Sequence, residues 1–590
     1  MGERSVFANA MRFLLVAAVV FATVMIVKAV DGLKTAVEGI RIVAGPAPRE
    51  KGDAKLANAE LYDPAAESGD EMIMTFTSDT KNMNYIVNNE SQVSSYWDLC
   101  YDSLAQRNYN TPDVFEPLLA ERWEVSDDKL TFTIHLRKGV LWHDFTDPTT
   151  GESFENVEVK AGDFAFYIDV IRNEKIACDP IRSYWKDLDR IEVIDDHTFK
   201  VIWKKKYFLS VSMTIGLSPL PRHFYRFDPE KADKEFDENT KRNSMIVGCG
   251  QWRFEKWEKD KACVFRRNEK YYGNKPALER LRFRMIKEPN ARLTALRKHE
   301  VDRIGLLPEQ WLDQTNDEPF ERDFAKFKYL SRSYSYIGWN MRRDLFKDRR
   351  VRLAMTHLVN RARIRAEVYR DLAEITTGNF WIASKSYDTS IKPWAFDLER
   401  AKALLAEAGW KDTDDDGVLD KDGKPLRFTL ATISNHPIQE RLAPIVKEDM
   451  AKAGVVMEIT PFEWSVYLDK LNKHDFDACT LGWALGYEGD PYQLWHSSEA
   501  DKEDTSNHCG FKNARADEII ETARREFDVE KRTALYHEFH KILHEEQPYT
   551  FLFSSKSLVT QDRRYRNAKV YPIESMHIRS MWVPAAEQRR

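Results

Sequence analysis

One stretch of the chain gathers aromatic and acidic side chains in a way that suits ligand recognition. Residues 478–483 form a short apolar run typical of a buried strand, and the run opens into a loop interrupted by glycine and proline. Open α/β sheets place their ligand sites at such strand ends. A carboxylate in the loop can pair with a cation. The candidate ligand-binding residues of this strand and loop are Gly482, Trp483, Ala484, Tyr487, Glu488 and Asp490.

Two other segments carry residues that could ligate a metal ion. His537, His540 and His544 share one face of a predicted helix, but the pattern is not HExxH, and a surface or packing role is favoured. Residues 412–423, DTDDDGVLDKDG, resemble a calcium loop, yet Gly423 stands where a bidentate Glu belongs. We expect a solvated turn there, with weak calcium binding as the alternative. We therefore assign no metal ligand and no cofactor.

No group of residues resembles a catalytic site. The sequence contains no nucleophile elbow, no phosphate loop and no paired His/Cys signature. Its six cysteines are scattered without a CxxC pair, which argues against a zinc ribbon or a thioredoxin-like site. We therefore predict that the protein binds its ligand without turnover.

The elements around the aromatic and acidic loop follow a β-α-β-α-β order. Strands are predicted over 427–432, 455–460 and 478–483, and helices over 438–453 and 464–472. This order implies parallel strands joined by right-handed crossovers, so that the loops after the strands share one edge. The loop 433–437 also starts a helix, whose free N–H groups attract an anion such as a carboxylate. It adds Ser434 and Asn435 to the candidate ligand-binding residues.

The first half of the chain mixes hairpins with helices. In residues 130–136 apolar and polar side chains alternate, which predicts a half-buried strand paired with residues 122–125. A second hairpin is predicted over 252–267. A chain of 590 residues, of which 43% are apolar, is too long for one core, so we expect two or three domains.

The N-terminus carries the only strongly apolar stretch of the chain, residues 11–27. Arg4 and Arg12 favour a cytoplasmic N-terminus, so everything after residue 30 should lie outside. Residues 1–30 are thus predicted to be a signal or a membrane anchor, and residues 31–71 a linker. The net charge of −6 gives no reason to expect nucleic acid as a partner.

Several blocks of the sequence, taken in order, match a known family. The most specific is FEPLLAERWEVSDDKLTFTIHLRKGVLWHD at 115–144, followed by VGCGQW at 247–252, YIGWN at 336–340 and the segment 462–498. Over residues 72–570 the chain resembles the peptide-type extracellular solute-binding proteins of bacterial ABC importers, which include oligopeptide- and dipeptide-binding proteins. The resemblance implies an α/β, two-lobed periplasmic-binding-protein-like fold with an additional subdomain in the first lobe.

The resemblance also implies a division of the chain. The first lobe would span residues 72–332 and include the extra subdomain at about 117–205. The second lobe would span residues 333–554. Residues 555–590 would return to the first lobe.

Further site residues follow from the resemblance. In peptide binders of this family the strand ending in Gly-Trp pairs with the main chain of an extended peptide, which here matches Gly482, Trp483 and Ala484. A facing strand in the first lobe, near residues 87–89, adds Asn88 and Asn89.

The block YIGWN adds Trp339 and Asn340, although Trp339 could equally be a core residue. In several members an acidic residue three positions after the Gly-Trp tryptophan holds the peptide amine. Gly486 stands at that position, so Glu488 or Asp490 would take over the contact.

The function that follows is capture of peptides in a cleft between the lobes and their delivery to the permease subunits of an ABC transporter. The protein would act as a monomer in the bacterial cell envelope, on the periplasmic or extracellular side of the cytoplasmic membrane. One alternative is a non-peptide solute, such as a metal chelate, an oligosaccharide or an opine. Another is an anchored sensor or chaperone without a transport role.

Overall fold

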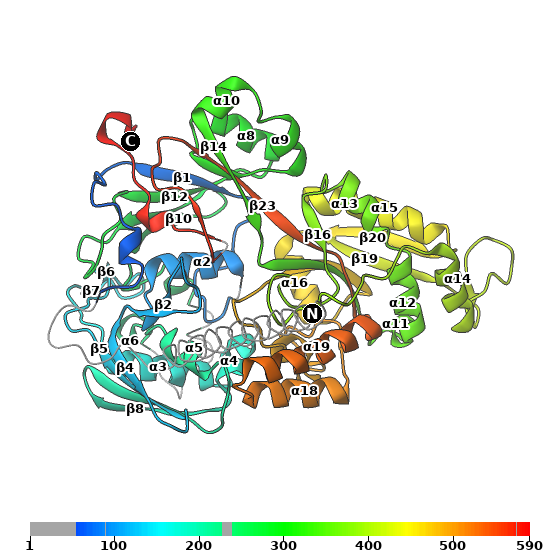
Figure 1. Ribbon diagram of the computed structural model, residues 1–590, viewed down its shortest axis with the longest axis horizontal. Coiled ribbons are helices and arrows are strands. Elements are labelled where there is room, and N and C mark those ends of the chain that lie inside the picture. The colour runs from blue at the N-terminus through cyan, green and yellow to red at the C-terminus, as the bar shows by residue number, and fades with distance from the viewer. Residues whose placement is uncertain (1–54, 89, 227–235, 237–238, 574, 590) are drawn as a thin grey trace, which may run out of the picture.

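The computed structural model folds into two lobes that lie side by side (Figure 1). It describes residues 55–589 apart from 89, 227–235, 237–238 and 574. The predicted signal or anchor at 11–27 lies outside the described residues, and so does the candidate Asn89. Within the described ranges, no helix combines the length and the apolar character needed to cross a membrane.

The first lobe is built on a mixed β-sheet. Its strands follow the order β10 (Trp252–Glu258), β11 (Ala262–Arg267), β12 (Arg280–Met285), β1 (Glu71–Phe76), β13 (Arg303–Gly305), β23 (Phe553–Asp562) and β14 (Phe324–Leu330). β10 and β11 form the hairpin that the sequence predicts, with Trp252 opposite Arg267. β1 pairs in parallel with β12, and the long β23 comes from the C-terminal part of the chain.

A four-stranded sheet forms the additional subdomain of the first lobe. Its strands follow the order β4 (Ala120–Val125), β5 (Thr131–Leu136), β9 (Thr198–Trp203) and β8 (Leu188–Asp195). In β5, Phe132, Ile134 and Leu136 are buried while the residues between them are half-buried, which confirms the predicted alternation. Helix α3 (Ala161–Arg172) packs against β8.

The second lobe holds a five-stranded sheet. Its strands follow the order β20 (Val456–Phe462), β19 (Arg427–Ile433), β21 (Ala478–Ala484), β15 (Ser333–Trp339) and β22 (Tyr549–Phe551). The crossover helices are α15 (Pro437–Ala451) and α16 (Trp464–Asn472). β19 is parallel to both β20 and β21, as the β-α-β-α-β order predicts. β15 is antiparallel to both of its neighbours, so the whole sheet is mixed rather than parallel.

Short connections join the lobes. β14 ends at Leu330 in the first sheet and β15 begins at Ser333 in the second, while β22 ends one residue before β23 begins. Helices α18 (Ala514–Arg525) and α19 (Val529–Glu546) of the second lobe lie beside α4 (Asp179–Trp185) of the subdomain (Figure 1). There the Phe208 N–H donates to the Arg524 carbonyl at 2.7 Å.

The ordered first lobe starts earlier in the chain than predicted. Ala57, Asn58 and Leu61 are buried, although the sequence assigns them to a linker. The Ala57 N–H donates to the Pro117 carbonyl at 2.9 Å, and a 3-10 turn covers Ala59–Leu61. One buried turn is too short to produce a hydrophobic period in the sequence, so the prediction of a linker was wrong for these residues.

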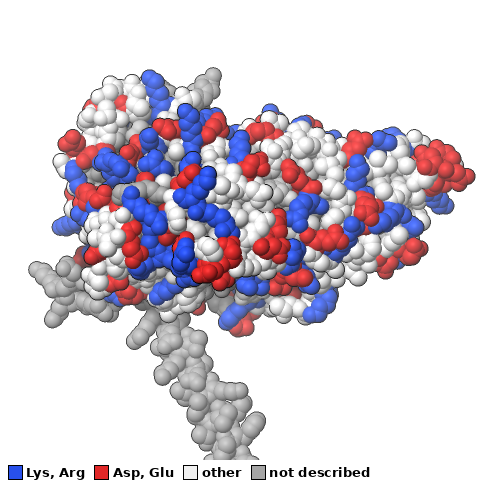
Figure 2. Space-filling model, turned by 90° about the horizontal axis from the view of Figure 1, so that it is seen from above, with Lys and Arg blue, Asp and Glu red and all other residues white. Residues whose placement is uncertain are grey.

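Basic and acidic side chains are intermixed over the face seen in Figure 2, without a broad field of one sign. An acidic cluster stands at the far end of the second lobe, where the loop after α14 (Leu398–Glu407) lies (Figures 1 and 2). It includes Asp412, Asp414 and Asp420.

Candidate ligand-binding site

Strand β21 has an edge that is open beyond its first residues. β19 pairs with it only at Ala478 and Cys479, whereas β15 pairs along its full length. The Leu485 N–H donates to the Arg332 carbonyl at 2.8 Å, which fixes the alternation of the antiparallel ladder. Leu481 and Trp483 therefore bond with β15, and Thr480, Gly482 and Ala484 direct their N–H and C=O groups to the other edge.

The first carbonyl on this open edge already has protein partners. Thr480 C=O accepts the Tyr467 hydroxyl at 2.5 Å and the Gln439 amide at 3.4 Å. Further along, Gly482 and Ala484 are exposed, and no described residue pairs with their main chain on this edge. An extended chain could continue the sheet at these two residues.

Trp483 lies between the two exposed residues and is half-buried. Its ring stacks on that of His508, with the centroids 5.9 Å apart. Burial lowers the pKa of His508 to about 3, so the ring that stacks on the indole is a neutral imidazole. The accessible part of the indole can cover a chain that pairs with β21.

The two carboxylates of the following loop are engaged by the protein itself. The Arg107 Nη2 donates to Glu488 Oε2 at 2.5 Å, and the Ser212 hydroxyl donates to the same oxygen at 2.8 Å. Asp490 Oδ2 accepts from Arg524 Nε at 2.8 Å and from the Tyr207 hydroxyl at 2.6 Å. Protein donors already bind one oxygen of each carboxylate, and the prediction that Glu488 or Asp490 receives the cation of a ligand stays a prediction.

These contacts make the loop a bridge between the lobes. Arg107, Ser212 and Tyr207 belong to the first lobe, and Glu488 and Asp490 to the second. Other side-chain hydrogen bonds also join the two lobes, among them Tyr487 to Asp113 at 3.0 Å, Tyr184 to Gln493 at 2.7 Å and Trp464 to Glu90 at 3.1 Å. The two lobes are therefore in direct contact, in a closed arrangement.

Trp339 and Asn340 do not reach this site. Trp339 is fully buried in the core of the second lobe, where its Nε1 donates to the Thr550 hydroxyl at 3.1 Å. The buried Asn340 amide donates to the carbonyls of His474 and Phe476. The prediction of ligand contact is corrected for both, because neither keeps accessible surface at the strand end.

The start of α15 is closed by a residue that the sequence analysis did not name. His436 is its N-cap and accepts the Gln439 N–H through Nδ1 at 3.3 Å. Burial lowers the pKa of His436. Ser434 donates its N–H to Phe462, and Asn435 is exposed with φ 58°. The predicted anion site therefore loses one of its free donors, and neither residue caps the helix.

The first-lobe candidate Asn88 is also occupied. Its amide donates to the Thr80 hydroxyl at 2.7 Å and to the Asn82 carbonyl at 3.1 Å. The Glu90 N–H donates to Asn88 Oδ1 at 3.1 Å. Asn88 thus shapes the loop before α2 (Ser91–Cys100) and has no described contact across the gap.

Comparisons with known proteins agree with this arrangement. A family described as bacterial extracellular solute-binding proteins, family 5, middle region, matches residues 114–504, more than half of the chain. The chain belongs to this family. The oligopeptide-binding protein AppA of Bacillus subtilis is 28% identical over 473 residues, covering 79% of this chain and 82% of that protein. The dipeptide-binding protein of Escherichia coli is 25% identical over 509 residues, covering 82% and 88%.

The fold also has solved counterparts. The structure of AppA from Bacillus subtilis in complex with a nonapeptide superposes with a TM-score of 0.79 at 25% identity. The match covers 88% of this chain and all of that chain. The two-lobed solute-binding fold with its extra subdomain is thereby established for this member of the family.

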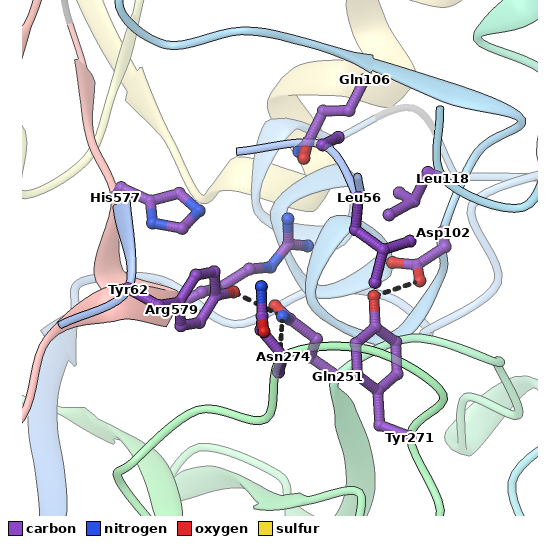
Figure 3. A pocket seen from close by; sticks show the side chains of 11 residues that line it. Leu56, Tyr62, Asp102, Gln106, Leu118, Gln251, Tyr271, Asn274, His577 and Arg579 are labelled. Carbon is purple, nitrogen blue, oxygen red and sulfur yellow. Dashed lines mark hydrogen bonds between the residues drawn. The ribbon is translucent and has the colours of Figure 1, made fainter. Parts of the chain in front are cut away.

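A small cavity inside the first lobe of this family member is separate from the open edge of β21. It has a volume of about 10 Å³, room for about one water molecule. The Arg579 side chain extends into it, Tyr271 donates to Asp102 at 2.7 Å, and Gln251 donates to Tyr62 at 2.5 Å (Figure 3). The cavity is too small for a peptide.

The metal candidates of the sequence lie away from the strand end. His540 bonds with Thr377 through Nε2 at 2.9 Å, and its Nδ1 accepts the Asp388 N–H. His537 contacts the Lys385 carbonyl, and His544 stacks on a tryptophan. Only the acidic cluster of the loop after α14 brings three ligand oxygens within 4.8 Å among the described residues. Our prediction of a solvated turn there remains a prediction.

Sequence reasoning missed the partners of the loop carboxylates. Arg107 lies 381 residues from Glu488, and Tyr207 lies 283 residues from Asp490. No local spacing connects residues so far apart in the chain. The motifs around them carried no signal that could have identified the pairs.

Proposed function

We propose that this protein captures extended peptides between its lobes and delivers them to the permease of an ABC importer. The observation that carries the proposal is the open edge of β21 at Gly482 and Ala484. Pairing at such an edge reads the main chain of a ligand and tolerates many side chains. The peptide-binding names of the relatives support the same ligand class.

Binding without turnover is part of the proposal. The strand end offers main-chain groups and an indole, and its loop carboxylates are held by guanidinium groups. None of these groups is an activated nucleophile with a neighbouring base. Membership of a solute-binding family supports this view.

We further propose that the folded lobes act outside the cytoplasmic membrane as a monomer. The family consists of extracellular solute-binding proteins. Residues 11–27 would export the chain or anchor it. The lobe boundaries at residues 332 and 554 and the return of residues 555–590 to the first lobe belong to the same proposal.

Native mass spectrometry of the purified protein tests the ligand class. We expect co-purified peptides, or binding of members of an equimolar set of peptides of two to nine residues. A twin of the tightest peptide, N-methylated at one backbone amide that pairs with β21, should bind about tenfold more weakly, since one hydrogen bond is lost. Binding of a metal chelate, a sugar or an opine, with no member of the peptide set retained, would overturn the proposal.

A further inference from the structure

Cys479 and Cys509 are two buried cysteines of the second lobe that the fold brings together. Cys479 lies in β21, where it pairs with Gly338 of β15. Cys509 lies in the loop before α18. No CxxC spacing joins the two residues in the sequence, so the geometry of the folded chain decides whether their sulfur atoms can bond.

Gly338 shows how close the two sulfur atoms are. A Cβ atom on Gly338 would lie 2.7 Å from Cys509 Sγ and 3.2 Å from Cys479 Sγ. Burial, and after it a hydrogen bond with the Cys479 thiol, raise the pKa of Cys509. The two sulfur atoms are therefore neighbours, and they fill the space that a side chain at position 338 would need.

The loop that carries Cys509 is fixed to the end of β15. The Met341 N–H donates to the Cys509 carbonyl at 2.8 Å. The Arg342 Nη1 donates to the carbonyl of the preceding residue, His508, at 2.7 Å. Because β15 is also the strand that pairs with β21, both cysteines are held against the same strand, and the sheet fixes their relative position.

The same loop supports the candidate ligand-binding strand. Cys479 and Trp483 lie on one face of β21, because side chains two and four residues apart along a strand share a face. The His508 ring stacks on the Trp483 ring with the centroids 5.9 Å apart, and Cys509 follows directly in the chain. A covalent link between Cys479 and Cys509 would hold this loop against the strand, next to its open edge.

We propose that Cys479 and Cys509 form a disulfide while the chain folds outside the cytoplasmic membrane. The inference rests on the proposed function, since that location is the one in which disulfides form and persist. Each thiol loses one proton and one electron, and an S–S bond forms between the two sulfur atoms. A protein disulfide or a small-molecule disulfide accepts the two electrons and two protons and is reduced to two thiols.

The position of the sulfur atoms determines when this reaction can occur. Both lie in a hydrophobic core that also contains Tyr467 and Tyr549. Disulfide exchange needs a thiolate that the oxidant can reach. Burial excludes the oxidant and raises the pKa of the Cys509 thiol, so little thiolate is present in the folded protein. The bond therefore forms during folding, before the core closes.

Peptide mapping of the full chain tests the bond. The protein is extracted from the cell envelope without reductant, its free thiols are alkylated in denaturant, and the digest is analysed by mass spectrometry without reduction. We expect one linked pair of peptides that contain Cys479 and Cys509, with the other four cysteines alkylated. Cys178→Ala is the matched control and should leave the link intact, since the Cys178 thiol is also buried but contacts the Ile171 carbonyl at 3.6 Å.

Refolding separates the geometry of the two cysteines from the location of the protein. The reduced, denatured chain is refolded with and without a mixture of oxidised and reduced glutathione. We expect the link only with the mixture, and a Tm roughly 5–10 °C higher for the linked protein, because the bond restricts the unfolded chain. Cys479→Ala should show equal Tm values under the two conditions. Oxidised glutathione added after refolding without it should leave both thiols free, because they are then buried.

The outcomes distinguish the inference from the proposed function. Free Cys479 and Cys509 thiols after refolding in the glutathione mixture, or links that join other cysteines instead, would overturn the inference. Free thiols in protein extracted from cells whose lobes are digested by external protease would overturn it as well. Lobes protected from protease would contradict the proposed location, and the refolding experiment would still decide whether the two cysteines bond.

Discussion

The hydrogen bond between Tyr207 and Asp490 allows a sharp test of how the lobes are held together. The Tyr207 hydroxyl donates to Asp490 Oδ2 at 2.6 Å, and Arg524 Nε donates to the same oxygen at 2.8 Å. The Asp490 side chain has no exposed surface. Tyr207→Phe removes the donor from the first lobe and leaves the ion pair inside the second lobe intact.

The expected magnitude follows from the charge of the acceptor. A hydrogen bond to a charged group contributes about 1.5–3 kcal/mol to stability. That free energy corresponds to roughly a tenfold to 150-fold change in the equilibrium between open and closed lobes. Because a ligand held by both lobes binds the closed state, its affinity should fall by up to the same factor.

Calorimetry with the tightest peptide of the set measures the affinity, and small-angle scattering of the ligand-free protein measures the closed fraction. Tyr536→Phe is the matched control, since no described residue bonds with the buried Tyr536 hydroxyl, while its ring lies 6.4 Å from that of Phe208 across the same interface. Equal affinity and equal scattering for the two variants would refute the role that we assign to Tyr207.

Two other predictions concern the role of Trp483 and the location of the lobes relative to the cytoplasmic membrane. Trp483→Ala should weaken peptide binding by about 2 kcal/mol, roughly thirtyfold, and leave the Tm unchanged. Trp339→Ala should instead lower the free energy of unfolding, measured in urea, by about 3–5 kcal/mol, because Trp339 is fully buried. Protease added to intact spheroplasts should digest the two lobes, and N-terminal sequencing should show whether residues 11–27 remain on the protein. Lobes that resist the protease would contradict the external location.

The parts of the fold that the sequence predicts are those determined by local patterns. The alternation in β5 and the succession of strands and helices from β19 to β21 both arise from neighbours in the chain. β15 could not be placed in this way. It precedes these elements in the chain yet lies between β21 and β22, and its antiparallel pairing depends on contacts that no local period encodes.

The candidate site likewise contains residues that local patterns predict and residues whose role depends on distant contacts. Gly482 and Ala484 owe their exposed main chain to the strand period and to the place where β19 stops pairing. For Glu488 and Asp490, the type of residue was informative but its role was not. Whether a carboxylate is free for a ligand depends on which cations the fold brings to it, and here these come from distant segments.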